Sequence, residues 1–171
     1  MGLSDVQALT ISDENAADAD RLVTAARPNT GATMAATTFA GGAARNVTVT
    51  TAGTSDNSKT NTIVGTDVFG NAISEVIVST GSAEAVAGAK FFVTVTSVTS
   101  SAQFAANITV GSGSLCAKAV GGGGRVRLVG TSIVSAGTAG LVDFYNGTPE
   151  DGSIVFKAQT IGTDHATVDN T

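Results

Sequence analysis

Valine and threonine alternate in the segment RNVTVTT, residues 45–51. In an extended chain this order places Val47 and Val49 on one face and the threonine hydroxyls on the other. A period of two residues over so short a segment is typical of a β-strand with one buried face. We therefore predict a strand over residues 45–51.

Further segments of the same kind lie downstream. Residues 62–66 and 72–79 flank the turn-forming sequence DVFGN, residues 67–71, and predict a hairpin. The alternation then predicts a single strand over residues 91–98 and a short one over 107–110. Turns are expected in the glycine- and serine-rich segments 53–58, 81–88, 100–106 and 111–113. Short strands joined by short loops predict an all-β fold, with a small antiparallel sandwich or barrel over residues 29–120.

Four consecutive glycines, residues 121–124, separate this module from the rest of the chain. Such a tract favours a flexible connector. Strands are predicted after it at 125–134, 141–145 and 153–158, so residues 121–171 form a second, smaller β-unit. No closing strand is predicted for it. We expect this unit either to pack on the first module or to be completed by another chain.

Residues 1–28 have a different composition, with five acidic side chains, and end at Arg27-Pro28. They predict an N-terminal arm. Ser12 followed by acidic residues and alanines favours a short helix, because its hydroxyl can cap the first turn. The alternative is an extended arm with a strand at residues 8–11. In either case, removing residues 1–28 is expected to leave the β-module folded.

Composition limits the classes of function. Val, Ile, Leu and Phe together number 41 among the 171 residues, so the core is expected to be thin. Charged residues make up 13%, about half the roughly 25% of an average soluble domain. The net charge of −5 argues against capture of a nucleic-acid backbone. We also expect neither a secretory leader nor a membrane span, because the first residues lack a basic segment followed by an apolar one and no apolar run reaches the roughly 18 residues that a span needs.

The residues that carry catalysis are scarce. The single Cys116 excludes an intramolecular disulfide and a multi-cysteine metal site. It lies among small apolar residues and is expected to behave as a minor hydrophobe. The single His165 lies in a polar stretch and is expected to be a solvated loop residue rather than a general base. We therefore predict no enzyme activity and no catalytic, cofactor or metal site.

Other motifs have plain structural interpretations. Residues 67–71 carry oxygen ligands without the spacing of a calcium-binding EF-hand, and a hairpin turn explains them. The tract 121–124 lacks the lysine and hydroxyl residue of a phosphate-binding loop. Arg125 and Arg127 share one face of a predicted strand, which is expected to be solvated or intersubunit. The Asn-x-Thr triplets at Asn46, Asn107 and Asn146 are read as ordinary strand and turn residues.

Several segments, in this order, resemble a β-module of virion structural proteins from tailed bacteriophages. They are RNVTVTTAG (45–53), GTD (65–67), GNAISE (70–75), FVTVTSVT (92–99), NITVG (107–111), and the C-terminal RVRL (125–128), AG (139–140) and FYNG (144–147). The resemblance implies a particle component. It brings no catalytic residues with it.

The expected function is therefore that of a capsid decoration or cement protein on the outer surface of a phage head. Its expected partners are the major capsid protein and further copies of itself, with a trimer favoured, and neither nucleic acid nor a membrane. It would be made in the host bacterial cytoplasm and reside in the virion. A neck, tail or fibre component is the alternative within the same class, and an immunoglobulin-like adhesin is the alternative from another class.

Overall fold

The computed structural model describes residues 17–81, 83–119, 130–134, 141–147, 152–159 and 165–169. Two compact units, Met1–Val120 and Gly121–Thr171, divide the chain. All strand pairs are antiparallel, which confirms the all-β prediction. The helical elements of the described residues are two single 3-10 turns, η1 (Ala40–Gly42) and η2 (Thr54–Asp56). Among those residues, no helix has the length and apolar character needed to cross a bilayer.

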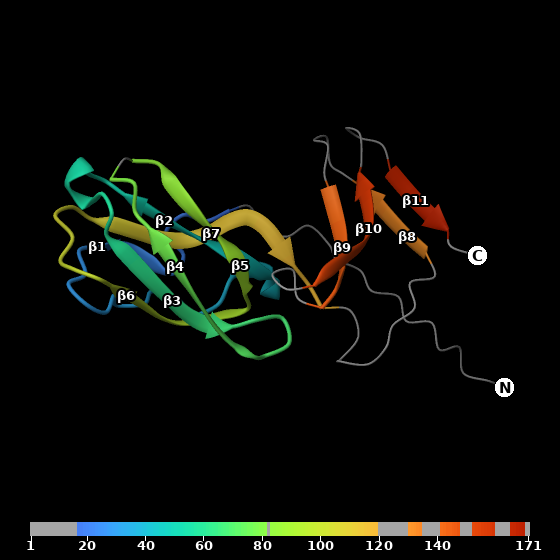
Figure 1. The fold of residues 1–171 in the computed structure, drawn as a ribbon, viewed down its shortest axis with the longest axis horizontal. Helices are drawn as coiled ribbons and strands as arrows, with labels where there is room; N and C mark the ends of the chain where they lie inside the picture. Colours follow the sequence, from blue (N-terminus) through green and yellow to red (C-terminus); the bar gives the residue numbers. More distant parts are fainter. Residues whose placement is uncertain are drawn as a thin grey trace. The chain divides into compact units, whose positions relative to one another are not determined.

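The first unit is a sandwich of two sheets (Figure 1). One sheet has the order β1-β7-β2-β5 and the other the order β4-β3-β6. The strands are β1 (Val23–Ala26), β2 (Ala44–Thr51), β3 (Thr60–Thr66), β4 (Ala72–Val78), β5 (Ala85–Phe92), β6 (Thr94–Ser100) and β7 (Ile108–Ala117). Strands β3 and β4 form the predicted hairpin, with residues 67–71 as its turn.

One face of each sheet lines a shared apolar core. In β2, Val47 and Val49 are at most 1% exposed, as their alternation predicts. Opposite them, Ile63 of β3 and Ile77 of β4 are buried, whereas the residues on either side of each are half-buried or exposed. The other buried apolar members of the core are Leu22, Val23, Phe39, Phe92, Val95, Val98, Phe104, Ile108 and Val110.

The prediction of a single strand over residues 91–98 is wrong. The chain leaves one sheet after Phe92 of β5, which pairs with Arg45, and enters the other at Thr94 of β6, which pairs with Thr66. Val93 lies between the two strands. The hydrophobic pattern runs on through this crossing because both strands pack against the same core.

A bulge in β6 also changes which residues face inward. Val64 pairs with Ser97 but the next residue, Gly65, pairs with Val95, so Thr96 is an extra residue in the ladder. Val95 and Val98 are therefore both fully buried although they are three positions apart. Strict alternation assigns them to opposite faces, and the bulge explains the difference.

Two glycine-containing segments predicted as turns are partly strand. Residues 85–88 belong to β5, and residues 111–113 belong to β7. The glycines of these segments do not form turns; they leave room for other parts of the chain to pack against the strand. A Cβ on Gly111 would lie 1.9 Å from the carbonyl oxygen of Asp18, and one on Gly113 would lie 2.4 Å from Oδ1 of Asn46.

The predicted N-terminal arm differs from the structure over residues 17–28. This segment holds a strand, β1, which pairs with β7, and it contains no helix. Leu22 and Val23 are fully buried in the core. Removing residues 1–28 would therefore take apolar side chains out of the sandwich, contrary to the expectation above. The predicted helix start at Ser12 and the alternative strand at 8–11 lie outside the described residues.

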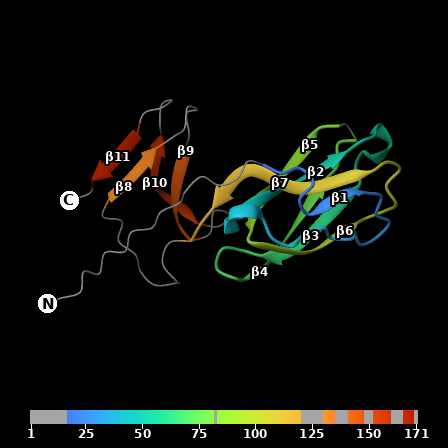
Figure 2. The ribbon, with the colours of Figure 1, turned by 180° about the vertical axis from the view of Figure 1, so that it is seen from behind.

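The second unit contains two two-stranded antiparallel sheets (Figure 2). Strand β9 (Leu141–Asn146) pairs with β10 (Ser153–Gln159), close to the predicted bounds. Strand β8 (Gly130–Val134) pairs with β11 (His165–Asp169), a strand that the sequence did not predict. His165 is thus the first residue of a strand and pairs with Val134 rather than lying in a loop.

Candidate interaction surface

The outward face of the β4-β3-β6 sheet carries hydroxyl and small apolar side chains and no charge. Because Ile63 and Ile77 point into the core, the alternate residues of their strands point outward. The outward residues are Ala72, Ser74, Val76 and Val78 on β4, Thr60, Thr62, Val64 and Thr66 on β3, and Thr94, Ser97 and Thr99 on β6. We call this set the threonine–valine face.

The apolar side chains of this face are concentrated on its outer strand. Val76 and Val78 of β4 are 57% and 50% exposed. They lie directly beside Thr62 and Thr60 of β3 in the strand register. A sheet surface with exposed valines and no charged group loses little by desolvation, and can pack against another protein surface of matching shape.

The charged residues of the first unit lie outside this face, and those among its described residues balance one another. Its described residues include six acidic and six basic side chains. The acidic ones are Asp18, Asp20, Asp56, Asp67, Glu75 and Glu84, and the basic ones are Arg21, Arg27, Arg45, Lys59, Lys90 and Lys118. The described part of the sandwich is therefore formally neutral, whereas the whole of residues 1–120, which adds Asp5, Asp13 and Glu14, has three more acidic than basic residues.

Glu75, the one acidic residue of β4, spans the opening between the two sheets. Its carboxylate oxygen Oε1 accepts a hydrogen bond from the backbone N–H of Ala89 at 2.7 Å, and Oε2 accepts one from Lys90 at 3.3 Å. A Cβ on Gly88 would lie 2.3 Å from this carboxylate, so glycine makes the approach possible. Glu75 thus binds donors of β5 at a point where β5 is bulged against β2.

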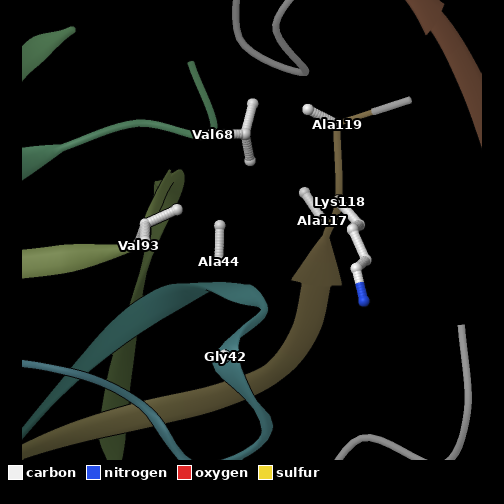
Figure 3. A pocket seen from close by; sticks show the side chains of 7 residues that line it. All are labelled: Gly42, Ala44, Val68, Val93, Ala117, Lys118 and Ala119. Atoms are coloured by element: carbon white, nitrogen blue, oxygen red, sulfur yellow. The ribbon is translucent and has the colours of Figure 1, made fainter. Parts of the chain in front are cut away.

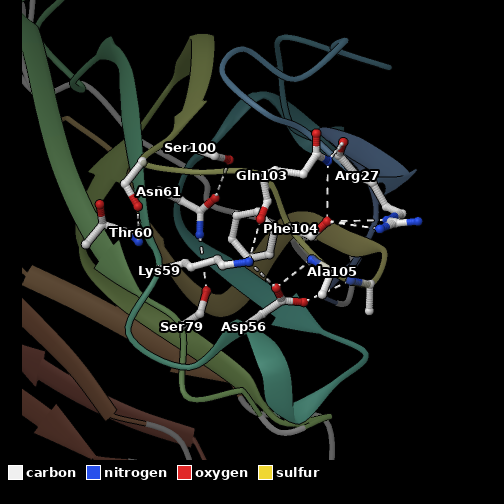
Figure 4. A network of polar contacts seen from close by, with 12 residues as sticks. Arg27, Asp56, Lys59, Thr60, Asn61, Ser79, Ser100, Gln103, Phe104 and Ala105 are labelled. Atoms are coloured by element: carbon white, nitrogen blue, oxygen red, sulfur yellow. Dashed lines mark hydrogen bonds and ion pairs between the residues drawn. The ribbon is translucent and has the colours of Figure 1, made fainter.

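A buried carboxylate organises the loops at one end of the sandwich (Figure 4). Asp56 is fully buried and accepts hydrogen bonds from Nζ of Lys59 at 2.7 Å and from the N–H groups of Ala105 and Ala106 at 2.7 and 3.0 Å. Burial opposes ionisation, but these donors outweigh it and hold the pKa of Asp56 below its usual 3.8. The Lys59 ammonium also lies 5.2 Å from the centre of the Phe104 ring.

The polar interior continues beside this carboxylate. Asn61, which is fully buried, donates from Nδ2 to Ser79 Oγ at 3.3 Å and accepts at Oδ1 from Ser100 Oγ at 3.0 Å. These bonds join β3 to Ser100, the last residue of β6, and to Ser79, the residue after β4 (Figure 4). Every named polar group has a partner within the protein, so the network is structural.

The DVFGN turn is closed by its own aspartate. Asp67 is 4% exposed, and its Oδ1 accepts hydrogen bonds from the N–H groups of Phe69 and Asn71, both at 2.8 Å. Burial raises the pKa of Asp67, but these bonds and one from the Asn71 side chain hold it below 3.8. The carboxylate therefore stabilises a hairpin turn, and Gly70 supplies the positive φ of 82° that the turn needs.

A shallow hollow of about 260 Å³ lies at the end of the first unit where its last described residues run (Figure 3). Small and apolar residues line it together with one lysine: Gly42, Ala44, Val68, Val93, Ala117, Lys118 and Ala119. This lining contains no nucleophile beside a base and no pair of carboxylates, and Lys118 is its one ionisable residue.

The residues singled out in the sequence do not converge on a site. Cys116 is an exposed residue of β7 rather than a buried hydrophobe. Among the described residues, no group of three or more His, Cys, Asp and Glu side chains could hold a metal ion. The tract 121–124, Arg125 and Arg127 lie outside the described residues. Of the three triplets, Asn46 is buried in β2, Asn107 is exposed before β7, and Asn146 is exposed at the end of β9.

Sequence reasoning did not identify the threonine–valine face. The sequence contains one indication of this face: every second residue of one predicted strand, Ser74, Val76 and Val78, is uncharged. That alternation predicts a strand but does not show which neighbours complete the face. No protein-family model matches this chain, and neither the curated proteins nor the solved structures include a significant match to it.

Proposed function

We propose that this chain is a non-catalytic structural protein of a tailed-bacteriophage virion, and specifically a decoration protein on the outer surface of the head. In this proposal the threonine–valine face of the sandwich packs against the major capsid protein. Copies of the chain also associate with one another. Many such contacts repeated over a shell would stabilise it by avidity, even though each contact is modest.

The threonine–valine face is the observation that carries this proposal. Interfaces between stable partners are depleted in charged residues at their centre. Here eleven outward residues on three adjacent strands include no charged side chain, and two valines at the margin are half exposed or more. Such a face suits contact with protein better than contact with a charged small molecule or with nucleic acid.

The second unit supports an assembly role from a separate observation. It has two two-stranded sheets, which bury little when isolated. Leu141, Ile154 and Val155 are 60%, 41% and 65% exposed in it. Exposed apolar side chains on small sheets favour burial against a further protein surface. Of the two alternatives from the sequence, packing on the first module or completion by another chain, this observation supports completion by another chain.

Binding to phage heads tests the proposal. Expanded heads that lack this protein are mixed with the purified full chain, and bound copies are counted by quantitative mass spectrometry after sedimentation. We expect saturable binding of hundreds of copies per head. Thr62→Lys, which places a charge at the centre of the threonine–valine face, should weaken binding about tenfold or more, because the lysine would be desolvated without a partner.

Ala87→Lys is the matched control, because Ala87 is an exposed residue on β5 of the other sheet. It should bind like the unmodified chain. Equal loss in both variants, or unchanged binding of Thr62→Lys, would reject the face as the docking surface. Saturation at six or twelve copies would instead place the protein in the neck or tail.

A further inference from the structure

Strand β4 presents an open edge in the first unit. It pairs with β3 on one side only, and it ends the order β4-β3-β6. The N–H of Ser79 donates to the carbonyl of Lys59 at 2.8 Å, and that of Asp67 donates to the carbonyl of Asn71 at 2.9 Å. Along an antiparallel ladder, residue pairs that hydrogen-bond to each other alternate with pairs whose backbone groups point away from each other. Ile73, Glu75 and Ile77 therefore bond toward β3, and the four other residues of β4 direct their backbone groups away from it.

This edge has the properties that favour addition of a strand. Its ladder with β3 runs over seven consecutive pairs without a bulge, whereas every other ladder of the sandwich has a register shift. The residues whose backbone groups point outward are Ala72, Ser74, Val76 and Val78, so no lysine or proline blocks the edge. A long, regular and uncharged edge strand is a template for pairing.

The other edges of the sandwich are protected. Residues 30–38 hydrogen-bond along β6, with Ala32 donating to Val98 and Val95 donating to Thr37, both at 2.9 Å. Strand β5 is bulged, and Glu75 binds its N–H groups. Strand β1 has only four residues, with a register shift and a positive φ of 42° at Ala25. Edges that are short, bulged or covered resist pairing, so β4 differs from all three.

We infer that β4 pairs antiparallel with β4 of a second copy of this chain, forming a two-fold dimer with a continuous six-stranded sheet. Backbone donors and acceptors in a strand register are satisfied by another extended strand. When β4 is the one open edge among the described strands of each sandwich, two copies can join edge to edge only through β4 of both, which gives an isologous contact rather than a ring. This differs from the trimer favoured by the sequence.

A second copy suits this edge electrostatically. The described part of the sandwich is formally neutral, and no charged side chain lies on the outward face of β4. Glu75, the one charged residue of β4, lies on its inward face, where the N–H groups of Ala89 and Lys90 hold its carboxylate, so the outward face of the seam carries no charge. The pairing would also double the threonine–valine face, and so the inference rests on, and extends, the proposed assembly function.

Sedimentation equilibrium of the full chain tests the inference across micromolar to millimolar concentrations. We expect a reversible monomer–dimer equilibrium. Val76→Lys places a charge on the edge strand and should weaken dimerisation about tenfold or more. Thr62→Lys is the matched control, since it places the same charge beside position 76 on the central strand β3. It should leave the dimer intact.

A nitroxide label provides an independent measurement that does not depend on the lysine variants. In a Cys116→Ser background, a label on Val76→Cys should lie within about 20 Å of its counterpart, because paired strands are about 4.8 Å apart. A label on Thr24→Cys, in β1 at the far edge of the other sheet, should give a longer distance.

Four results would contradict the β4–β4 pairing. A monomer at all concentrations, a trimer, equal loss of the dimer in Val76→Lys and Thr62→Lys, or a long distance at position 76 would do so. Head binding is measured separately. A dimer that does not bind heads would reject the proposed function and keep the β4 contact, while a monomer that binds heads through Thr62 would do the reverse.

Discussion

Asp56 shows how a single side chain can hold together segments far apart in the sequence. Its carboxylate joins Lys59, three residues away, to the N–H groups of Ala105 and Ala106, about fifty residues away. An aspartate in a turn is common, and its sequence context does not distinguish this one. Only the tertiary structure brings its distant donors within reach.

We predict that Asp56→Asn lowers the free energy of unfolding by about 2–3 kcal/mol at pH 7. The variant keeps the shape of the side chain but leaves the Lys59 ammonium without its ion pair and turns one acceptor into a donor. Chemical denaturation followed by circular dichroism measures the change. The exposed Glu84→Gln serves as control and should unfold like the unmodified chain.

We also predict that the loss of stability in Asp56→Asn depends on pH. Because the pKa of Asp56 is lowered in the folded protein, the unfolded chain binds more protons, and stability increases with pH until the unfolded carboxyl is ionised. The stabilisation should be complete above about pH 5 and should be lost as pH falls below 3.8. The unfolding curves of Asp56→Asn and the unmodified chain should converge in acid. A constant difference between them down to pH 2 would contradict the assigned ion pair.

At the scale of elements, the strands follow from local alternation, but their bounds depend on neighbours. Val93 separates β5 from β6 because the chain changes sheets there. Gly111 and Gly113 remain in β7 because other chain segments need the space that their missing side chains leave. A glycine in a strand and a glycine in a turn look alike in the sequence, and so these segments were predicted as turns.

Gly65 of β3 gives a test at this scale. A Cβ there would lie 1.9 Å from the carbonyl oxygen of Thr94, at the bulge between β3 and β6. We expect Gly65→Ala to cost about 2 kcal/mol or more of stability, because backbone must move to accept it. Gly31→Ala, where a Cβ meets nothing within 4 Å, should change the thermal midpoint little. Equal midpoints for the two variants would show that the bulge relaxes freely.

At the scale of the whole molecule, the buried apolar cluster of the described residues lies in the first unit. All members of the buried cluster, from Leu22 to Val110, fall within Met1–Val120. A unit that encloses its own core can fold by itself. We predict that residues 1–120, expressed alone, give amide NMR resonances that match those of the same residues in the full chain. Broad, collapsed resonances from the fragment would show that the second unit is needed for folding.

The sequence alone determined the fold class, the β3–β4 hairpin and the division into strand-forming segments, because hydrophobic alternation and turn chemistry act between near neighbours. Only the tertiary structure decided that residues 22 and 23 enter the core, that β5 and β6 belong to different sheets, and that β4 has an open edge. Which strand lies at an edge depends on pairings between segments far apart in the chain, and alternation within one segment carries no information about its partner.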